Sequence, residues 1–186
     1  MWRSRGQQAR LLGEYFSATH FTAIHTSDLK RAFDTAQVLY DHQKDPKPSF
    51  DSSNLLRELD YGRAGGKLCL DEPIPGLTWV QHAARGIYLA KYSDDDRFPD
   101  GESIKDLAVR ARSALEKFVL PYVWQAAKEG KTGIHVANVS HGLCISELVS
   151  GLLNWDGKKG RSTGSEYSDI PNAGWNRVVI DIEVSG

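Results

Sequence analysis

The chain has little cysteine, no long apolar run and almost no excess of charge of either sign. Each of these absences argues against a class of function. Its two cysteines, Cys69 and Cys144, lie far apart without metal-ligand spacing, so we expect reduced thiols in a cytoplasmic protein and no metal site. No apolar run approaches the length of a membrane span, and the first residues lack the apolar core of a secretion signal. A formal net charge of -1 gives no electrostatic reason to expect binding to nucleic acid or to a membrane.

What the sequence does contain is the patterning of an ordinary globular domain. Its 186 residues, 40% of them hydrophobic and 25% charged, are enough for one domain with its own core. The spacing of apolar residues predicts helices and strands that alternate, which favours an α/β fold with a mainly parallel sheet. The predicted helices cover residues 4–18, 28–40, 104–122 (kinked or divided at Pro121) and 143–154, the predicted strands cover 21–24, 133–139 and 175–184, and 44–53 is predicted as a loop.

The region between Gly62 and Gly101 has weaker periodicity than the rest of the chain. It is rich in glycine and proline and contains an acidic run at 94–96, which indicates irregular structure around one or two short helices, one of them near 78–90. An insert of this length in an α/β domain is often a lid or a substrate-binding element. We therefore expect one domain over residues 1–186, with residues 63–100 as a lid that selects the substrate.

The turn Ser140-His141-Gly142 is the most informative local feature. It follows an apolar run at 133–139 that is typical of a buried strand, and it opens the predicted helix at 143–154. This arrangement places an imidazole beside the unpaired backbone N–H groups of a helix N-terminus, where a phosphate group can bind.

Three other clusters lie where a predicted strand ends or a predicted helix begins, which is where ligands bind in open α/β sheets. Ser27 can cap the helix that follows it, and Arg31 in the first turn of that helix could hold two phosphate oxygens. Glu58 could protonate a leaving oxygen if its surroundings raise its pKa. Gly101-Glu102-Ser103 precedes Arg110 on the next predicted helix. Taken singly, each cluster is better explained as surface charge, a helix cap or a structural residue than as part of a functional site.

Together, in this order and spacing, the clusters resemble the histidine phosphatase superfamily, the phosphoglycerate mutase-like proteins. The resemblance covers the chain from about residue 7 to residue 183. It is carried by S-D-L-x-R-A-x-x-T-A at 27–36, L-x-E-x-x-x-G at 56–62, G-E-S at 101–103 with Arg110, V-S-H-G at 139–142, and a polar residue, Asn172, before the last predicted strand.

The resemblance implies a three-layer α/β sandwich and a phosphohistidine mechanism without metal or cofactor. In such a mechanism one histidine attacks the phosphoryl group, and water or a second substrate oxygen then receives it. The resemblance implies that Arg31 binds phosphate, that His141 is the second histidine of the pocket and that Glu58 donates a proton. It also implies that Ser27 and Gly142 shape the pocket walls.

One hallmark of the family has no counterpart in this chain. The family's first strand ends in R-H-G, which supplies the nucleophilic histidine and a second phosphate-binding arginine, whereas residues 7–13 resemble the helix that follows it. His25 ends a predicted strand but occupies a position where the family tolerates several residues. We therefore expect the first strand to be absent through truncation, splicing or a true loss of activity. The two strand edges left unpaired would be covered by rearrangement or in a homodimer.

Several functions stay open. The leading hypothesis is a phosphatase of small phosphorylated metabolites, such as a sugar phosphate or phosphoglycerate, with residues 1–186 alone impaired. A phosphoglycerate mutase, or a pseudophosphatase that binds a phosphorylated ligand without turnover, is the alternative. A nucleophile elbow of a serine hydrolase at Ser140 is a third hypothesis, although no histidine follows it in the chain to complete a triad.

Overall fold

The computed structural model describes residues 4–70, 72–89, 94–155 and 170–181, which fall into two compact units. The first unit comprises the residues up to Glu58 and from Arg110 onward, and the second comprises Leu59–Val109. The second unit contains the whole segment 63–100 that the sequence marks as an insert. Its function as a lid stays a prediction.

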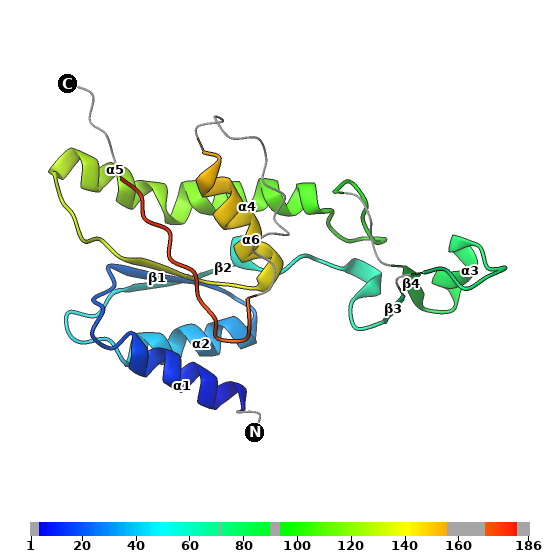
Figure 1. Cartoon of the computed structure of the whole chain (residues 1–186), viewed down its shortest axis with the longest axis horizontal. Helices are drawn as coiled ribbons and strands as arrows, with labels where there is room; N and C mark the ends of the chain where they lie inside the picture. Colours follow the sequence, from blue (N-terminus) through cyan, green and yellow to red (C-terminus); the bar gives the residue numbers. More distant parts are fainter. Residues whose placement is uncertain (1–3, 71, 90–93, 156–169, 182–186) are drawn as a thin grey trace. The chain divides into compact units, whose positions relative to one another are not determined.

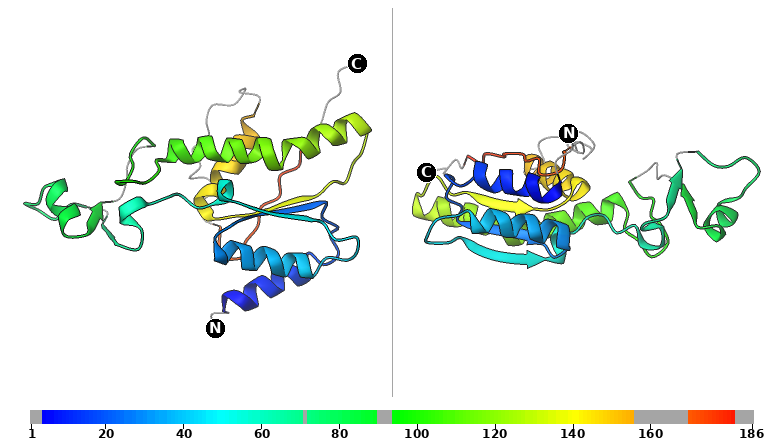
Figure 2. Two further views of the ribbon diagram at one scale, coloured as in Figure 1. Left: turned by 180° about the vertical axis from the view of Figure 1, so that it is seen from behind. Right: turned by 90° about the horizontal axis from the view of Figure 1, so that it is seen from below.

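The first unit is a three-layer α/β sandwich, as expected. Its sheet has the order β2-β1-β5 with all described strands parallel. Helices α1 and α2 cover one face of this sheet, and α4, α5 and α6 cover the other (Figures 1 and 2). Its elements are α1 (Arg5–Tyr15), β1 (Ala23–Ser27), α2 (Lys30–Asp41), β2 (Ser49–Ser53), η1 (Asn54–Leu56), the part of α4 (Ile104–Phe118) from Arg110 on, α5 (Leu120–Glu129), β5 (Val136–Val139) and α6 (Gly142–Leu153).

The central strand β1 is buried on both faces, so the sheet needs a layer of helices on each side. All five of its residues are buried, because it has a parallel neighbour on each side and a helical layer above and below. Between the sheet and α2, a cluster of buried side chains forms the core. Its members are Phe21, Ile24, Ala36 and Leu39, against which Phe16, Tyr40, Phe50, Ala137 and Val139 pack. Burying a side chain such as Ile24 completely contributes about 1.5–3 kcal/mol.

Several element boundaries differ from the sequence predictions for physical reasons. Residues 49–53, predicted within a loop, form β2. This strand is largely polar because it lies at the edge of the sheet, and its register with β1 pairs Ile24 with Phe50. The prediction of a division at Pro121 is confirmed, since α4 ends at Phe118 and α5 begins with this proline in its first turn.

The predicted last strand, 175–184, is wrong for the residues that the structure describes. Residues 175–181 are extended chain without assigned strand structure, and residues 182–184 lie outside the described ranges. An isolated extended segment becomes a strand only by hydrogen bonding to a neighbouring strand, and within the described ranges this segment has no such neighbour.

The backbone of the second unit shows why two positions of the sequence motifs, 62 and 101, require glycine. It contains η2 (Gly62–Ala64), α3 (Trp79–Ala84) and a parallel pair of short strands, β3 (Leu68–Leu70) and β4 (Ile87–Leu89). Gly62 has a positive φ of 49°, and a Cβ there would collide with the carbonyl oxygen of Pro99. A Cβ at Gly101 would lie 2.6 Å from the carbonyl oxygen of Asp60. Glu102 fixes this close approach, because its Oε2 accepts the N–H of Asp60 at 3.0 Å.

Candidate functional site

His141 lies at the end of β5, directly before α6, and its side chain is the centre of a buried hydrogen-bond network. Only 7% of the residue is exposed. Arg31 donates from Nε to His141 Nδ1 at 2.9 Å, so Nδ1 is an acceptor and the ring proton is on Nε2. That Nε2 lies 3.0 Å from Ser27 Oγ and donates to it. The three residues therefore come together from the ends of two neighbouring strands and the first turn of α2.

The electrostatic surroundings keep this imidazole neutral. Burial lowers the pKa of His141 from 6.5 to about 4, and the positive charges of Arg31 and Arg110 add to the effect. At neutral pH the ring is therefore a hydrogen-bond donor without charge, beside a guanidinium that carries one. The terminal nitrogens of Arg31 have no hydrogen-bond partner within the described ranges, so they are available to an oxyanion.

Ser27 has a different local role from the one that the sequence predicts. It is the last residue of β1 rather than the cap of α2, whose N-cap is Leu29 without a side-chain hydrogen bond. Ser27 Oγ accepts the N–H of Leu29 at 3.2 Å while it contacts His141. It therefore fixes the turn that leads from β1 into α2 and accepts the N–H of the histidine ring, whose tautomer Arg31 sets.

Glu58 is held beside the Ser-His-Gly turn by the backbone around it. Arg110 of α4 donates to three carbonyl oxygens, those of Leu55, Arg57 and Glu58, at 3.0, 2.8 and 3.1 Å. Ser140 Oγ donates to a fourth, that of Leu56, at 2.7 Å. The sequence gives Arg110 no role beyond its place after G-E-S, and these contacts assign it one: it shapes the segment that carries Glu58.

The N-terminus of α6 is partly occupied by a carboxylate of the chain itself. Glu58 Oε2 lies 3.4 Å from the N–H of Leu143, next to Gly142, the first residue of the helix. The anion site expected at this helix is therefore shared between Glu58 and the Arg31–His141 pair. Both groups, together with Gly142, line one large cleft of the first unit.

An ion pair that sequence reasoning missed connects the two motifs. Arg57 donates from Nε and Nη2 to the two carboxylate oxygens of Asp28, both at 2.7 Å, and it holds the pKa of Asp28 below its usual value. Arg57 occupies the variable position between Leu56 and Glu58 in the second motif. No pattern in the sequence pairs it with Asp28, so only the fold could reveal the contact.

Two residues considered as nucleophiles are engaged elsewhere. The ring of His25 is buried, packs on Phe118 at 4.6 Å and lies 5.8 Å from Tyr122, and burial lowers its pKa. The Ser140 hydroxyl donates to a backbone carbonyl, while the imidazole of His141 turns to Ser27. This geometry does not support the nucleophile-elbow hypothesis. Within the described ranges, no three His, Cys, Asp or Glu side chains are grouped to hold a metal ion.

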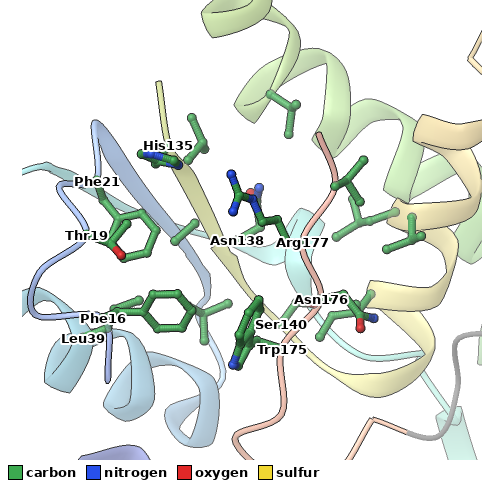
Figure 3. A pocket seen from close by; sticks show the side chains of 18 of the residues that line it. Phe16, Thr19, Phe21, Leu39, His135, Asn138, Ser140, Trp175, Asn176 and Arg177 are labelled. Atoms are coloured by element: carbon green, nitrogen blue, oxygen red, sulfur yellow. The ribbon is translucent and has the colours of Figure 1, made fainter. Parts of the chain in front are cut away.

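The cleft itself extends well beyond Arg31, Glu58 and His141. It has a volume of about 1710 Å³ and continues along β5 and residues 170–181, including Asn172. Figure 3 draws some of the side chains that line it. Figure 3 shows Asn138 and Arg177 between these two segments. Helices on both faces of the sheet supply the remaining walls.

Comparison with known proteins identifies the family. A model of the histidine phosphatase superfamily (branch 1) matches residues 5–183. The chain belongs to this superfamily. The site just described thus lies in a histidine phosphatase fold, with the matched residues reaching from α1 past the end of the described chain.

Relatives and solved structures of the superfamily agree with this assignment. The chain is 32% identical over 153 residues to a probable phosphoglycerate mutase GpmB of Enterobacter sp. (strain 638), and 33% identical over 147 residues to that of Salmonella arizonae. Each match covers 79% of this chain and 60% of the relative, so the chain spans about 60% of the length of these relatives.

Among solved structures, a mycobacterial glucosyl-3-phosphoglycerate phosphatase in complex with inorganic phosphate matches with a TM-score of 0.55 and 25% identity, over 83% of this chain and 72% of that one. The ecdysone phosphate phosphatase of Bombix mori, in complex with tungstate, matches with a TM-score of 0.52 over 85% of this chain and 58% of that one. At 17% identity, the second likeness shows the fold alone. In the part of the chain that the structure describes, no helix is both long and apolar enough to span a membrane.

Proposed function

We propose that the protein is a phosphatase of small phosphorylated metabolites that works through a phosphohistidine. Residues 1–186 carry the phosphate-binding and proton-donating groups, and the nucleophilic histidine comes from outside them. The observation that carries the proposal is the contact between Arg31 and His141, a guanidinium fixed against a buried, neutral imidazole at the ends of two parallel strands.

The first unit's own groups have distinct tasks in this proposal. The terminal nitrogens of Arg31 hold two phosphoryl oxygens, and His141 Nε2–H turns from Ser27 Oγ to a third. A bound phosphate dianion raises the pKa of His141, because a nearby negative charge favours the imidazolium. Phosphate binding thereby adds positive charge where the transition state carries spread negative charge.

The phosphoryl group is transferred in two chemical steps. The external histidine attacks phosphorus through a ring nitrogen, the bond from phosphorus to the ester oxygen breaks, and Glu58 gives that oxygen a proton. A water molecule then attacks phosphorus, the bond to nitrogen breaks, and the proton of the water returns to Glu58. Arg110 and Ser140 keep the segment that carries Glu58 in place throughout.

A second candidate is a phosphoglycerate mutase, favoured by the name of the curated relatives at 32% and 33% identity. A mutase returns the phosphoryl group to the substrate instead of passing it to water. With 3-phosphoglycerate, a mutase converts the substrate to 2-phosphoglycerate without releasing inorganic phosphate, and a phosphatase releases it. The ratio of the two products therefore decides between the candidates.

Phosphate binding tests the proposed pocket directly on this chain. Isothermal titration with inorganic phosphate should show binding that Arg31→Ala weakens by about tenfold or more, because a charge-assisted bidentate contact contributes about 1.5–3 kcal/mol. Lys30→Ala is the matched control, since Lys30 is the adjacent residue and pairs only with exposed Asp34 at 2.9 Å in the described chain. Equal binding by both variants would contradict the assignment of the pocket.

Turnover tests the proposal that the nucleophilic histidine comes from outside residues 1–186. Residues 1–186 should hydrolyse little or no p-nitrophenyl phosphate in the presence of a chelator, and no phosphohistidine should be trapped. A trapped phosphohistidine on this chain would show that it supplies its own nucleophile. Phosphate binding without either result is expected both for residues 1–186 of a phosphatase whose nucleophile lies outside them and for a pseudophosphatase.

A further inference from the structure

His25 is a buried ionisable side chain that the proposed mechanism does not use. It lies in the centre of β1, and only 3% of the residue is exposed. Its two ring nitrogens, Nδ1 and Nε2, are fully buried and have no hydrogen-bond partner within the described ranges. A neutral imidazole can donate one hydrogen bond and accept another, so each unpaired nitrogen costs the folded chain about 1–3 kcal/mol.

The ring of His25 lies against the break between α4 and α5. The preceding residue, Ile24, belongs to the core cluster between the sheet and α2, and successive side chains of a strand alternate between its two faces. His25 is therefore directed to the other face, where its ring packs on that of Phe118 at a centroid distance of 4.6 Å and lies 5.8 Å from that of Tyr122. Phe118 is the last residue of α4, and Tyr122 lies in the first turn of α5.

Two charged groups of opposite sign act on this ring. Asp51 lies opposite His25 in the register of β1 with β2, and its Oδ2 is 3.8 Å from Nδ1, which is too far for a hydrogen bond. Lys117 of α4 carries the positive charge. The amide of Asn138 on β5 and the phenol of Tyr122 are the uncharged polar groups beside the ring. Burial lowers the pKa of His25, Asp51 opposes this effect, and Lys117 adds to it.

Helix α5 is held to the sheet by fewer buried residues than α6. It begins at Leu120, which is its buried residue, and its N-cap, Val119, makes no side-chain hydrogen bond. The N–H groups of Tyr122 and Val123 share the carbonyl of Val119, at 3.1 and 3.3 Å. Helix α6, in the same layer, buries six residues. A helix with few buried contacts opens locally at the lowest cost in free energy, so α5 is the element that a charge on His25 would displace.

We propose that His25 is an acid switch at the break between α4 and α5. At neutral pH the uncharged ring packs on Phe118 and Tyr122. When the pH falls, the ring takes up a proton from water and Nδ1–H moves about 1 Å closer to Asp51, to the usual length of a charge-assisted hydrogen bond. The first turn of α5 then opens, because a buried charge is costly until water or a partner reaches it. Raising the pH removes the proton and closes the turn again.

The switch is connected to the phosphate site by the elements that carry it. His25 lies two residues before Ser27 on β1, and Ser27 contacts His141. Helix α4, which ends at the break, carries the Arg110 that holds the segment of Glu58. Opening at the break should therefore weaken phosphate binding at acidic pH. This consequence rests on the proposed function, whereas the switch itself does not.

Hydrogen exchange tests the switch on the chain as it exists. Between about pH 7 and pH 5, protection of the amides of Tyr122 and Val123, corrected for the intrinsic effect of pH, should fall by about fivefold or more. The open state binds the proton more readily than the closed state, so acid favours opening, and amides of α2 should show no such fall. The fall should disappear in His25→Phe, which keeps an aromatic ring against Phe118. It should remain in His20→Phe, the same substitution at an exposed histidine.

Two exposed charges provide variants that leave the core intact. In NMR spectra, the ring resonances of His25 and the amide resonance of Tyr122 should change at a common pH midpoint. Asp51→Asn should lower this midpoint, because it removes the charge that favours the imidazolium, and Lys117→Gln should raise it. The charges that act on His141 are different ones, so these two shifts identify the ring that is responsible.

The outcomes separate the switch from the proposed function. A His25 that titrates while α5 keeps its protection, or an α5 that opens equally in His25→Phe, would overturn the inference. So would midpoints that move in the opposite directions in the two charge variants. With inorganic phosphate at about pH 5, His25→Phe should bind about fivefold more tightly than the unaltered chain, and His20→Phe should bind like it. Equal binding by His25→Phe would reject the connection to the site, whereas no phosphate binding by the unaltered chain at pH 7 would reject the proposed function instead.

Discussion

The segment that carries Glu58 and the open edge of β5, which is the edge away from β1, lie within one unit, yet they differ completely in how their backbone is bonded. Every carbonyl from Leu55 to Glu58 accepts a hydrogen bond from a side chain, three from Arg110 and one from Ser140. Along the open edge of β5, neither the backbone nor the buried Oδ1 of Asn138 has a partner within the described ranges.

The difference teaches that the groups at the strand ends are held in place without the open edge of β5. Arg31, Ser27 and His141 are fixed by the pairing of β1 with β5 and by α2, and Glu58 is fixed by α4. None of these contacts uses the open edge. Arg31, Ser27, His141 and Glu58 are therefore fixed by contacts within the described elements, and variants of those contacts test this.

The largest effect on the free energy of unfolding is expected from removing Arg110, which holds the segment that carries Glu58. Arg110→Ala leaves the carbonyls of Leu55, Arg57 and Glu58 without this charged donor, so the free energy of unfolding should fall by roughly 2–4 kcal/mol. Urea denaturation measures the loss. Exchange of the amides of Val136 and Asn138 relative to the rest of β5 should not change.

Arg112→Ala is the matched control for Arg110→Ala. It removes an arginine two residues further along α4 that pairs with Glu116 at 3.3 Å and stacks on Trp155 at 4.3 Å, contacts that contribute about 1 kcal/mol or less. If both variants lose the same stability, the carbonyl contacts of Arg110 do not organise the segment.

A smaller effect on the free energy of unfolding is expected when the pH is varied, because His141 titrates. Its pKa is lowered to about 4 in the folded chain and is near 6.5 when unfolded, so between these values the unfolded state binds a proton that the folded state does not. The contribution of His141 to the free energy of unfolding should therefore be fully present above about pH 6.5. As the pH is lowered towards 4, the free energy of unfolding should fall by roughly 1–2 kcal/mol. The measurement is the urea midpoint as a function of pH, with the ring resonances of His141 followed by NMR.

Two variants assign this pH dependence to the site. In Arg31→Gln the pKa of His141 should rise, because one of the charges that lower it is gone. In His141→Gln the part of the pH dependence due to this residue should disappear, and what remains includes the contribution of buried His25, whose pKa is also lowered. A His141 that titrates near 6.5 in the unaltered chain would show that the network around it is open to water.

The sequence predicted the family through the resemblance of its motifs and the α/β class through its patterning. It also predicted the helix whose first turn carries Arg31 and the strand-to-helix turn that carries His141. It did not predict β2, since an edge strand needs few apolar residues. It predicted a strand at 175–184, whose described residues 175–181 are not a strand because strand formation depends on a neighbour as well as on the segment's own side chains. Contacts such as those of Arg110 with the carbonyls of Leu55, Arg57 and Glu58 join residues more than fifty positions apart. Only the packing of α4 against that segment determines them.

The smallest effect on the free energy of unfolding is expected from the ion pair between Asp28 and Arg57. This pair connects the segment that carries Glu58 to the start of α2, so it is a further contact that could hold that segment in place. The geometry is bidentate at 2.7 Å, but the two side chains are 33% and 50% exposed, so the coupling free energy should be only about 0.2–1 kcal/mol. A double-mutant cycle of Asp28→Asn and Arg57→Gln, followed by urea denaturation, measures it. Salt at 1 M should reduce the coupling further, because exposed charges are screened. A coupling above about 2 kcal/mol would mean that this pair, rather than Arg110 and Ser140, holds the segment in place.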